Sequence, residues 1–335
     1  MDRRRTTNNM PKRLLKLDKE EAHLITKPAR DGFGEALLML CEKGSDIFVL
    51  DADVSKSTRT NWIGDQYPGK FLNMGISEQD MVGTAAGLAL GGIIPFVATY
   101  GVFLSGRAWD QIRTTVCYNN LPVKFGGAHA GISVGPDGAT HQALEDIAIM
   151  RVLPNMTVIA PCDSIEVRKA TLAAAAYPGP VYLRFGREAV PVITDESSPF
   201  EIGKANLLQQ GDDVALVACG AMVYQALQAA KALRKEGISA TVINLHTIKP
   251  IDKDALFSAA RRCGCIVTAE EHQIYGGMGS AVAEVLAQGY PVPIEMVAVA
   301  DSFGESGQPD ELMEKYGLVS IDILRAAKRA IGRKR

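Results

Sequence analysis

The chain has 335 residues, of which 47% are hydrophobic and 22% charged, a balance typical of a globular protein long enough for two domains. Its net charge of −2 predicts no general affinity for nucleic acid or for anionic membranes. The 6 cysteines form no CxxC pair, so we expect reduced core thiols in a cytoplasmic protein and no zinc site.

Basic residues gather at both ends of the chain. Residues 1–16 contain six basic residues against one acid, and residues 325–335 contain six basic residues and no acid. Such ends are most often solvated or disordered tails, which is the expectation here. A short Arg-rich organelle presequence at the start, or an arm that docks on a partner subunit, are the alternatives.

Helical and strand patterns alternate along the first half of the chain. The expected helices include 32–43, 77–90 and 164–176, with Asp163 or Ser164 as the N-cap of the last. The expected strands are 46–53, 71–75, 93–99, 121–127, 156–161 and 179–185.

A stretch without any charged residue runs from Met81 to Gly106. Its length raises the question of a membrane span. Gly91, Gly92 and Pro95 interrupt it, however, and we interpret it as a buried helix followed by a buried strand.

A polar, proline-containing segment at 190–205 is the expected linker. The alternation then restarts with strands and helices at 212–220, 221–237, 238–246, 251–264, 265–271, 278–288 and 293–299. Alternation of this kind predicts the α/β class, with two doubly wound domains of mostly parallel sheet at 25–190 and 204–325.

Glu78 stands at the expected start of the helix that opens the uncharged stretch, with Ser77 as a possible N-cap. The helix end favours the ionised carboxylate, whereas burial against Met74, Ile76 and Met81 would favour the neutral acid. A carboxyl group under these opposed influences is suited to proton transfer, although an ordinary first-turn glutamate explains the spacing equally well.

Glycines repeat every four residues along the same helix, at Gly83, Gly87 and Gly91. They therefore share one face of the helix, and each costs about 1 kcal/mol relative to alanine. Two interpretations stay open. Either another helix of the same domain packs tightly there, or a helix of a second subunit does.

A glycine-rich loop lies between His129 and His141 and contains Asp137. Glycine allows a ligand to approach the backbone, so such loops often carry function. A structural loop with capping histidines is the alternative.

Four motifs, in this order and spacing, resemble the transketolase family: GISEQ, TYGVFLSGRAWDQIR, HAGISVGPDGATHQALEDIAIMRVLPNMTVIAPCD and LRFGRE. The third is the most specific, and the likeness runs from about residue 28 to about residue 318. It implies a pyrimidine-binding thiamine diphosphate domain followed by a transketolase C-terminal domain.

The resemblance also implies roles for individual residues. Glu78 would hydrogen-bond the aminopyrimidine ring and relay a proton, and the apolar surroundings of Glu78 would strengthen that bond. Phe103 would stack on the ring with Tyr100 beside it, and Asp53 would lie near the thiamine site. The implied substrate contacts, to phosphate or sugar, are Arg30, Ser57, His129, Asp137, His141 and Arg187, with His141 also counted as catalytic.

The sequence departs from the family in two respects. The diphosphate and metal signature, GDG followed by an Asn some thirty residues later, is absent, and the likeness covers only the second half of a full transketolase. The chain therefore resembles the separate C-terminal subunit of a split bacterial transketolase. A separate N-terminal subunit would hold the diphosphate and Mg²⁺ or Ca²⁺, since this chain lacks the signature for either. We expect a heterotetramer that acts on sugar phosphates of the pentose phosphate pathway or of a rarer sugar catabolism.

Three other functions compete with this one. A 2-oxoacid dehydrogenase beta subunit is disfavoured by the GPDGATHQALED loop, and a deoxyxylulose-phosphate synthase is normally a longer single chain. A non-catalytic partner subunit is disfavoured because Glu78, Phe103, His129, Asp137 and His141 are all present.

Overall fold

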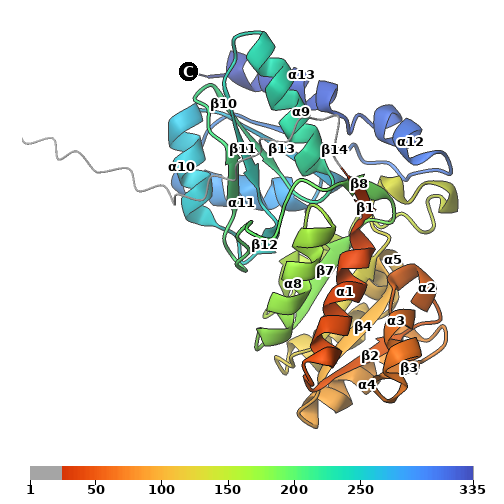
Figure 1. The fold of residues 1–335 in the computed structure, drawn as a ribbon. Coiled ribbons are helices and arrows are strands. Elements are labelled where there is room, and N and C mark those ends of the chain that lie inside the picture. The colour runs from red at the N-terminus through yellow and green to blue at the C-terminus, as the bar shows by residue number, and fades with distance from the viewer. Residues whose placement is uncertain (1–24, 335) are drawn as a thin grey trace, which may run out of the picture.

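The structure is a computed structural model that describes residues 25–334. Two α/β lobes follow one another along the chain, as Figure 1 shows, and each is built on a mostly parallel sheet. The predicted fold class is therefore confirmed. The basic residues at 1–16 lie outside the described residues.

The first lobe contains a seven-stranded sheet in the order β12-β6-β7-β5-β4-β2-β3. Its strands are β2 (Ile47–Asp51), β3 (Phe71–Asn73), β4 (Ile94–Tyr100), β5 (Lys124–Ala128), β6 (Thr157–Ile159), β7 (Val181–Phe185) and β12 (Thr247–Lys249). All neighbours are parallel except β12, which pairs antiparallel with β6. The central strands are buried, which explains their nearly continuous apolar sequence.

The helices of the first lobe cover both faces of this sheet. They are α1 (Ala29–Glu42), α2 (Ser55–Thr58), α3 (Asn61–Gln66), α4 (Glu78–Leu90), α5 (Gly101–Arg107), α6 (Trp109–Gln111), α7 (Asp146–Arg151) and α8 (Ser164–Ala176). Helix α1 begins directly after Pro28 and buries Phe33, Leu37 and Leu40 on one face, against a core shared with α8. Each such side chain contributes about 1.5–3 kcal/mol by leaving water.

The second lobe contains a five-stranded sheet in the order β14-β13-β10-β11-β9, in which only β9 is antiparallel. Its strands are β9 (Asn206–Gln209), β10 (Val214–Ala218), β11 (Ala240–Asn244), β13 (Ile266–Gln273) and β14 (Ile294–Val299). Its helices are α9 (Met222–Lys235), α10 (Lys253–Cys263), α11 (Met278–Gly289), α12 (Pro309–Lys315) and α13 (Ser320–Gly332).

The two lobes are joined by more than the linker. The expected linker at 190–205 begins with the end of β8 (Ala189–Pro191), which pairs antiparallel with β1 (Thr26–Pro28). Asp163 caps α8 by accepting from the Glu166 N–H, as predicted, and the same side chain accepts from the N–H groups of Ile193 and Thr194. Strand β12 belongs to the second half of the sequence but extends the first sheet.

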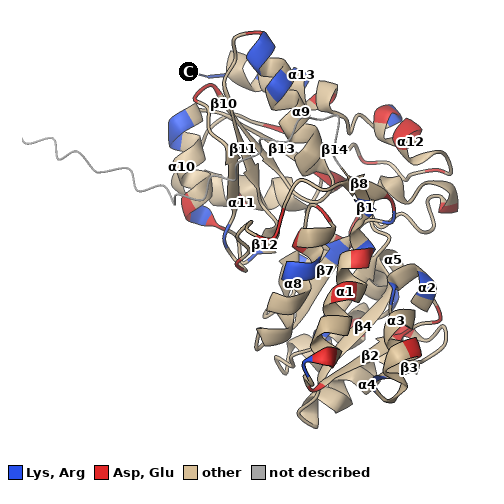
Figure 2. Ribbon diagram, in the orientation of Figure 1, with Lys and Arg blue, Asp and Glu red and all other residues tan. Residues whose placement is uncertain are grey.

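The expectation of a basic tail at 325–335 was wrong. Most of this segment belongs to α13, where Figure 2 colours the basic positions of the ribbon blue. The helix buries Ala326, Ala327 and Ala330, and its Arg329 and Arg333 bond the carboxylate of Glu295. An apolar stripe and paired charges hold the segment on the second sheet.

The uncharged stretch folds as predicted, into the buried face of α4 followed by the buried strand β4. Within residues 25–334, no helix is both long and apolar enough to cross a membrane. All six cysteines lie in the described part of the chain, where each is a buried free thiol.

Candidate functional site

The candidate site lies at the carboxyl edge of the seven-stranded sheet, where parallel strands commonly place ligands. Ser57 follows β2, and Glu78 follows β3. Tyr100 ends β4, His129 follows β5, and Arg187 follows β7. Residues far apart in the sequence therefore meet because their strands end at the same edge.

Glu78 begins α4 and is almost completely buried, with 1% of its side chain exposed. Ser77 occupies the N-cap position, but its hydroxyl donates to the carbonyl of Met74 and does not cap the helix. Ile76 is 74% exposed, so it does not help to bury Glu78 as expected.

The purely apolar surroundings predicted for Glu78 are also wrong. The Nη1 group of Arg107 lies 2.8 Å from Oε2 of Glu78, and the arginine side chain is 46% exposed. The guanidinium also lies over the ring of Phe103, with Cζ 4.6 Å from the centroid. Arg107 ends the uncharged stretch in the sequence, and this position was the only signal that could have pointed to it.

Aromatic rings form the centre of the site. Tyr100 stacks on His129 with ring centroids 4.5 Å apart, and Phe103 lies 6.1 Å from Tyr100. His141 meets both Phe103 and Tyr100 edge-on, at 5.2 and 5.8 Å. The structure thus brings together the two predicted ring-binding aromatics and both loop histidines. His141 lies five residues before the start of α7 and does not cap that helix, whose N-cap position is Glu145.

Polar contacts extend this aromatic group toward α1 and α2. The hydroxyl of Tyr100 donates to Oγ of Ser57 at 3.1 Å. Nη1 of Arg30 donates to the backbone carbonyl of Ser57 at 3.2 Å and lies 3.0 Å from Nε2 of His129. These residues therefore form one connected group.

His129 is held in the neutral form. Burial, together with the positive charges of Arg30 and Arg187, lowers its pKa to about 3. Nε2 then accepts from Arg30, which leaves the proton on Nδ1. Nδ1 is buried and has no hydrogen-bond partner in the described chain. His129 also has a positive φ of 55°, a strained conformation typical of functional positions.

Arg187 and Asp137 lie beside this group and contact each other. Nη1 of Arg187 lies 2.9 Å from Oδ1 of Asp137 and also donates to the carbonyl of Val134. Both side chains are about two-thirds buried, at 31% and 29% exposure. The predicted phosphate-binding arginine and the predicted hydroxyl-binding acid therefore form an ion pair in this chain.

Asp53 lies at the margin of the site. Its Oδ1 accepts from Nδ2 of Asn73, whose own Oδ1 accepts from the N–H of Gly75 in the turn before α4. Within residues 25–334, no hydrogen bond or ring contact joins Asp53 to the aromatic group. Its φ of 64° places the side chain in a left-handed turn after β2.

The glycine face of α4 is open in this chain. A Cβ atom added at Gly83 or at Gly87 would meet no atom of the described chain within 4 Å beyond the adjoining backbone of α4, and both residues are exposed. Tight packing within the domain is therefore excluded for these two glycines.

Comparison with known proteins identifies the family. The transketolase pyrimidine-binding domain matches residues 26–192, and the transketolase C-terminal domain matches residues 203–323. A putative transketolase C-terminal section of Methanocaldococcus jannaschii is 45% identical over 88% of this chain and 93% of its own length.

The chain belongs to the transketolase family. A 6-deoxy-6-sulfo-D-fructose transketolase subunit of Clostridium sp. strain MSTE9 is 43% identical over 91% of this chain and 95% of its own length. A 1-deoxy-D-xylulose-5-phosphate synthase of Thermomicrobium roseum is 42% identical over 86% of this chain, which spans 46% of that enzyme. The solved structure of a split gene transketolase, described as an inactive beta4 tetramer, superposes with a TM-score of 0.85 at 45% identity, covering 93% of this chain and 100% of that one.

Proposed function

We propose that this transketolase-family chain is the C-terminal subunit of a split, thiamine diphosphate-dependent transketolase. With a separate N-terminal subunit it transfers a two-carbon ketol unit between sugar phosphates. The observation that carries the proposal is the buried carboxylate of Glu78 near the ring of Phe103. Arg107 connects the two, because its guanidinium bonds Glu78 and lies over that ring. High similarity over nearly the full length of split-subunit relatives supports it.

The site fits the pyrimidine end of thiamine diphosphate. A flat ring needs an aromatic face and a carboxyl group at its edge, and Phe103 and Glu78 supply these groups. The fit does not extend to the diphosphate, because residues 25–334 contain no group of three or more His, Cys, Asp or Glu side chains placed to hold a metal ion. We therefore assign the diphosphate and Mg²⁺ or Ca²⁺ to the partner subunit.

When bound, thiamine diphosphate supplies the electron sink for breaking and forming the carbon–carbon bond. Glu78 holds and moves a proton at its carboxylate, whose Oε2 also accepts from Arg107. Phe103 and Tyr100 orient the ring, and Asp53 borders the cofactor from the end of β2.

The remaining residues bind and orient the sugar phosphate. Arg30 and Arg187 supply bidentate donors for the phosphate, together with Ser57. Neutral His129 presents an unused Nδ1–H as a donor to a substrate oxygen, and His141 reaches the reacting carbonyl or hydroxyl. Asp137 accepts from a substrate hydroxyl once Arg187 turns to the phosphate.

We also propose an assembly of two copies of each subunit, with the glycine face of α4 packed against another subunit. Open space at Gly83 and Gly87 supports a helix-to-helix contact there. The buried free thiols are consistent with a reducing compartment, and we place the protein in the cytoplasm.

A deoxyxylulose-phosphate synthase-like reaction is the alternative, since one such enzyme is 42% identical to this chain. A related role as a 2-oxoacid dehydrogenase beta subunit has no comparable support among these relatives. Transfer of a ketol unit to an aldose phosphate, rather than condensation of pyruvate with glyceraldehyde phosphate, distinguishes the first two reactions.

Titration calorimetry tests the proposal directly. The purified chain alone should show negligible binding of thiamine diphosphate with Mg²⁺, and the mixture with the N-terminal subunit should bind it and catalyse ketol transfer. Tight binding by this chain alone would overturn the split-subunit assignment.

A further inference from the structure

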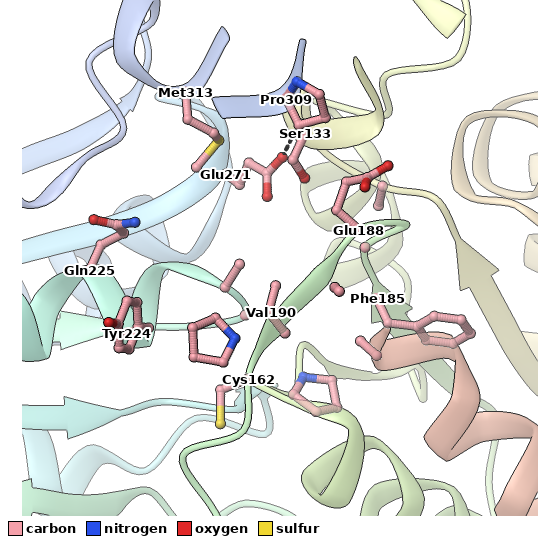
Figure 3. Close-up of a pocket in the computed structure, with 18 of the residues that line it drawn as sticks. Ser133, Cys162, Phe185, Glu188, Val190, Tyr224, Gln225, Glu271, Pro309 and Met313 are labelled. Carbon is pink, nitrogen blue, oxygen red and sulfur yellow. Dashed lines mark hydrogen bonds between the residues drawn. The ribbon is translucent and has the colours of Figure 1, made fainter. Parts of the chain in front are cut away.

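A cavity of about 270 Å³ lies between the two lobes, beside the glycine-rich loop that contains Ser133 (Figure 3). Its wall is built from the segments that follow β5, β6, β7 and β10, from β13 itself, and from the starts of α9 and α12. None of the roles proposed above uses this space.

The cavity opens at a reversal in the second sheet. Strands β10 and β13 are neighbours, but the chain leaves β10 toward β11 on one side and leaves β13 toward β14 on the other. Open parallel sheets bind ligands in the crevice at such a reversal, outside the carboxyl ends of the strands. Gly220, just after β10, and Glu271, near the end of β13, both line the cavity.

Glu271 offers an acceptor to this space. The side chain is only 5% exposed, and its Oε1 accepts from the N–H of Ser133. Figure 3 shows the other carboxylate oxygen pointing away from that bond, among the cavity residues. A carboxylate can accept about four hydrogen bonds, so Glu271 keeps acceptor capacity beside the backbone and side-chain bonds that Ser133 makes to it. Burial raises the pKa of Glu271, and the nearby Arg184 opposes that rise.

Arg184 offers a donor to the same space. It is 6% exposed, its Nε binds Asp146, and its Nη2 donates to the carbonyls of Ala143 and Glu271. Its Nη1 has no hydrogen-bond acceptor in the described chain. Helix α9 begins beside it without a side-chain cap, and Gly220 and Ala221 of that start line the cavity.

We propose that this cavity binds a small hydroxylated carboxylic acid. The carboxylate would accept from Arg184 and from the uncapped start of α9, and a hydroxyl would donate to Glu271. A ligand with only one kind of group would use either the donors or the acceptor of the cavity, and would therefore bind more weakly than a ligand that uses both. Glu188 and Asp310 also line the cavity, so a multiply charged anion fits it poorly.

The cavity shares a wall with the candidate active site. Ser133 belongs to the glycine-rich loop between His129 and His141, and Glu188 directly follows Arg187. The loop packs closely on Glu271, because a Cβ atom added at Gly131 would lie 2.2 Å from its Oε1. A ligand that orders Glu271 therefore acts on the loop that carries three predicted substrate contacts.

Calorimetry with three six-carbon probes tests the proposal on the full chain. Gluconate carries a carboxylate and hydroxyls, sorbitol carries hydroxyls only, and hexanoate carries a carboxylate only. Gluconate should bind saturably with a Kd below about 10 mM and at least about 10-fold more tightly than either of the others. Absence of gluconate binding, or equal binding of all three, overturns the proposal.

Two variants locate the binding. Glu271→Gln should weaken gluconate binding about 10-fold or more, since a charge-assisted bond is lost. Glu270→Gln is the matched control, because Glu270 is equally buried on the same strand but bonds the N–H groups of Met278 and Gly279 instead. Equal effects of the two substitutions would place gluconate elsewhere.

A third variant tests the cavity independently, in case Glu271→Gln does not fold. Ala221→Leu adds a side chain in the wall of the cavity at a half-buried position. It should abolish gluconate binding while the unfolding temperature stays close to that of the wild type. Unchanged gluconate affinity in Ala221→Leu would show that the cavity is not the site.

Discussion

Buried charges are held differently at the aromatic site and at the junction between the lobes. At the junction, Asp146 accepts from the Tyr182 hydroxyl and from Nε of Arg184, whose Nη2 reaches two carbonyls. At the site, the carboxylate of Glu78 has one side-chain partner within residues 25–334, the half-exposed Arg107.

The difference follows from what each region must do. A buried ion pair is tolerated when further hydrogen bonds satisfy both partners, as they do for Asp146 and most of Arg184. Site residues keep incomplete contacts and strained backbone, as His129 does, so that a ligand can complete them. Loss of a charge should therefore affect activity at the site and stability at the junction.

Glu78→Gln gives the largest expected effect. With the N-terminal subunit present, the rate of ketol transfer should fall about 10²–10⁴-fold, because the amide cannot relay a proton. Stability should change little, since the amide oxygen still accepts from Arg107. Glu295→Gln, on the surface pair with Arg329, is the control and should keep full activity. Activity of Glu78→Gln within a few-fold of wild type would refute the proton relay.

Asp146→Asn should have the opposite signature. It removes the hydrogen-bonded counter-charge of the buried Arg184 guanidinium, which should cost about 3–5 kcal/mol of unfolding free energy in urea. Glu284→Gln removes a charge from the exposed pair with Arg151 and should cost less than about 1 kcal/mol. Equal losses of unfolding free energy in the two variants would show that the buried ion pair at the junction contributes no more to stability than an exposed one.

Arg187→Ala separates phosphate binding from loop support. KM should rise about 10–100-fold for phosphorylated sugars and much less for unphosphorylated ones, because a charge-assisted bond to the phosphate is lost. Steady-state kinetics on both kinds of sugar make the comparison. The same rise for both would mean that Arg187 acts only by holding Asp137.

Arg107→Met tests the ion pair between Arg107 and Glu78. Removing the cation leaves the buried carboxylate unpaired and should cost about 1 kcal/mol of unfolding free energy in the chain alone. In a Glu78→Gln background the same substitution should cost less, which a double-mutant cycle measures. Additive effects would show that the two side chains do not interact in solution.

The pH dependence of stability tests the same comparison through His129, without any change in activity. The pKa of His129 is about 3 in the folded chain and near 6.5 when unfolded, so the unfolded state binds more protons between these values. Its contribution to stability is present above pH 6.5 and is lost as the pH falls toward 3. In His129→Gln the unfolding free energy should therefore fall less steeply over this window in urea titrations.

Lys124 provides the contrast within the same sheet. Burial lowers its pKa to about 7, so its effect on stability lies between pH 7 and 10.5, where stability rises with pH. Lys124→Met should leave the acidic window unchanged and flatten the alkaline one. A change of slope below pH 6.5 in this variant would contradict the assignment of that window to His129.

Much of the fold was predictable because its signals are local. The apolar strands, the start of α8 at Asp163 and the buried face of α4 each depend on residues within one strand or a few helical turns. The motifs around Glu78 and between His129 and His141 likewise pointed to the site before any contact was known. The C-terminal segment was predicted to be a tail because its basic residues outnumber its apolar ones. The structure shows instead that the alanines between them are buried in α13.

The sequence by itself determined the alternation of strands and helices, the family and the candidate site residues, because each of these depends on residues close together in the chain. Only the tertiary structure decided that Arg107 contacts Glu78, that β12 joins the first sheet and that Glu271 faces a cavity. These pairings join residues that are distant along the chain. They depend on how the sheet edges and lobes pack, which no local pattern encodes.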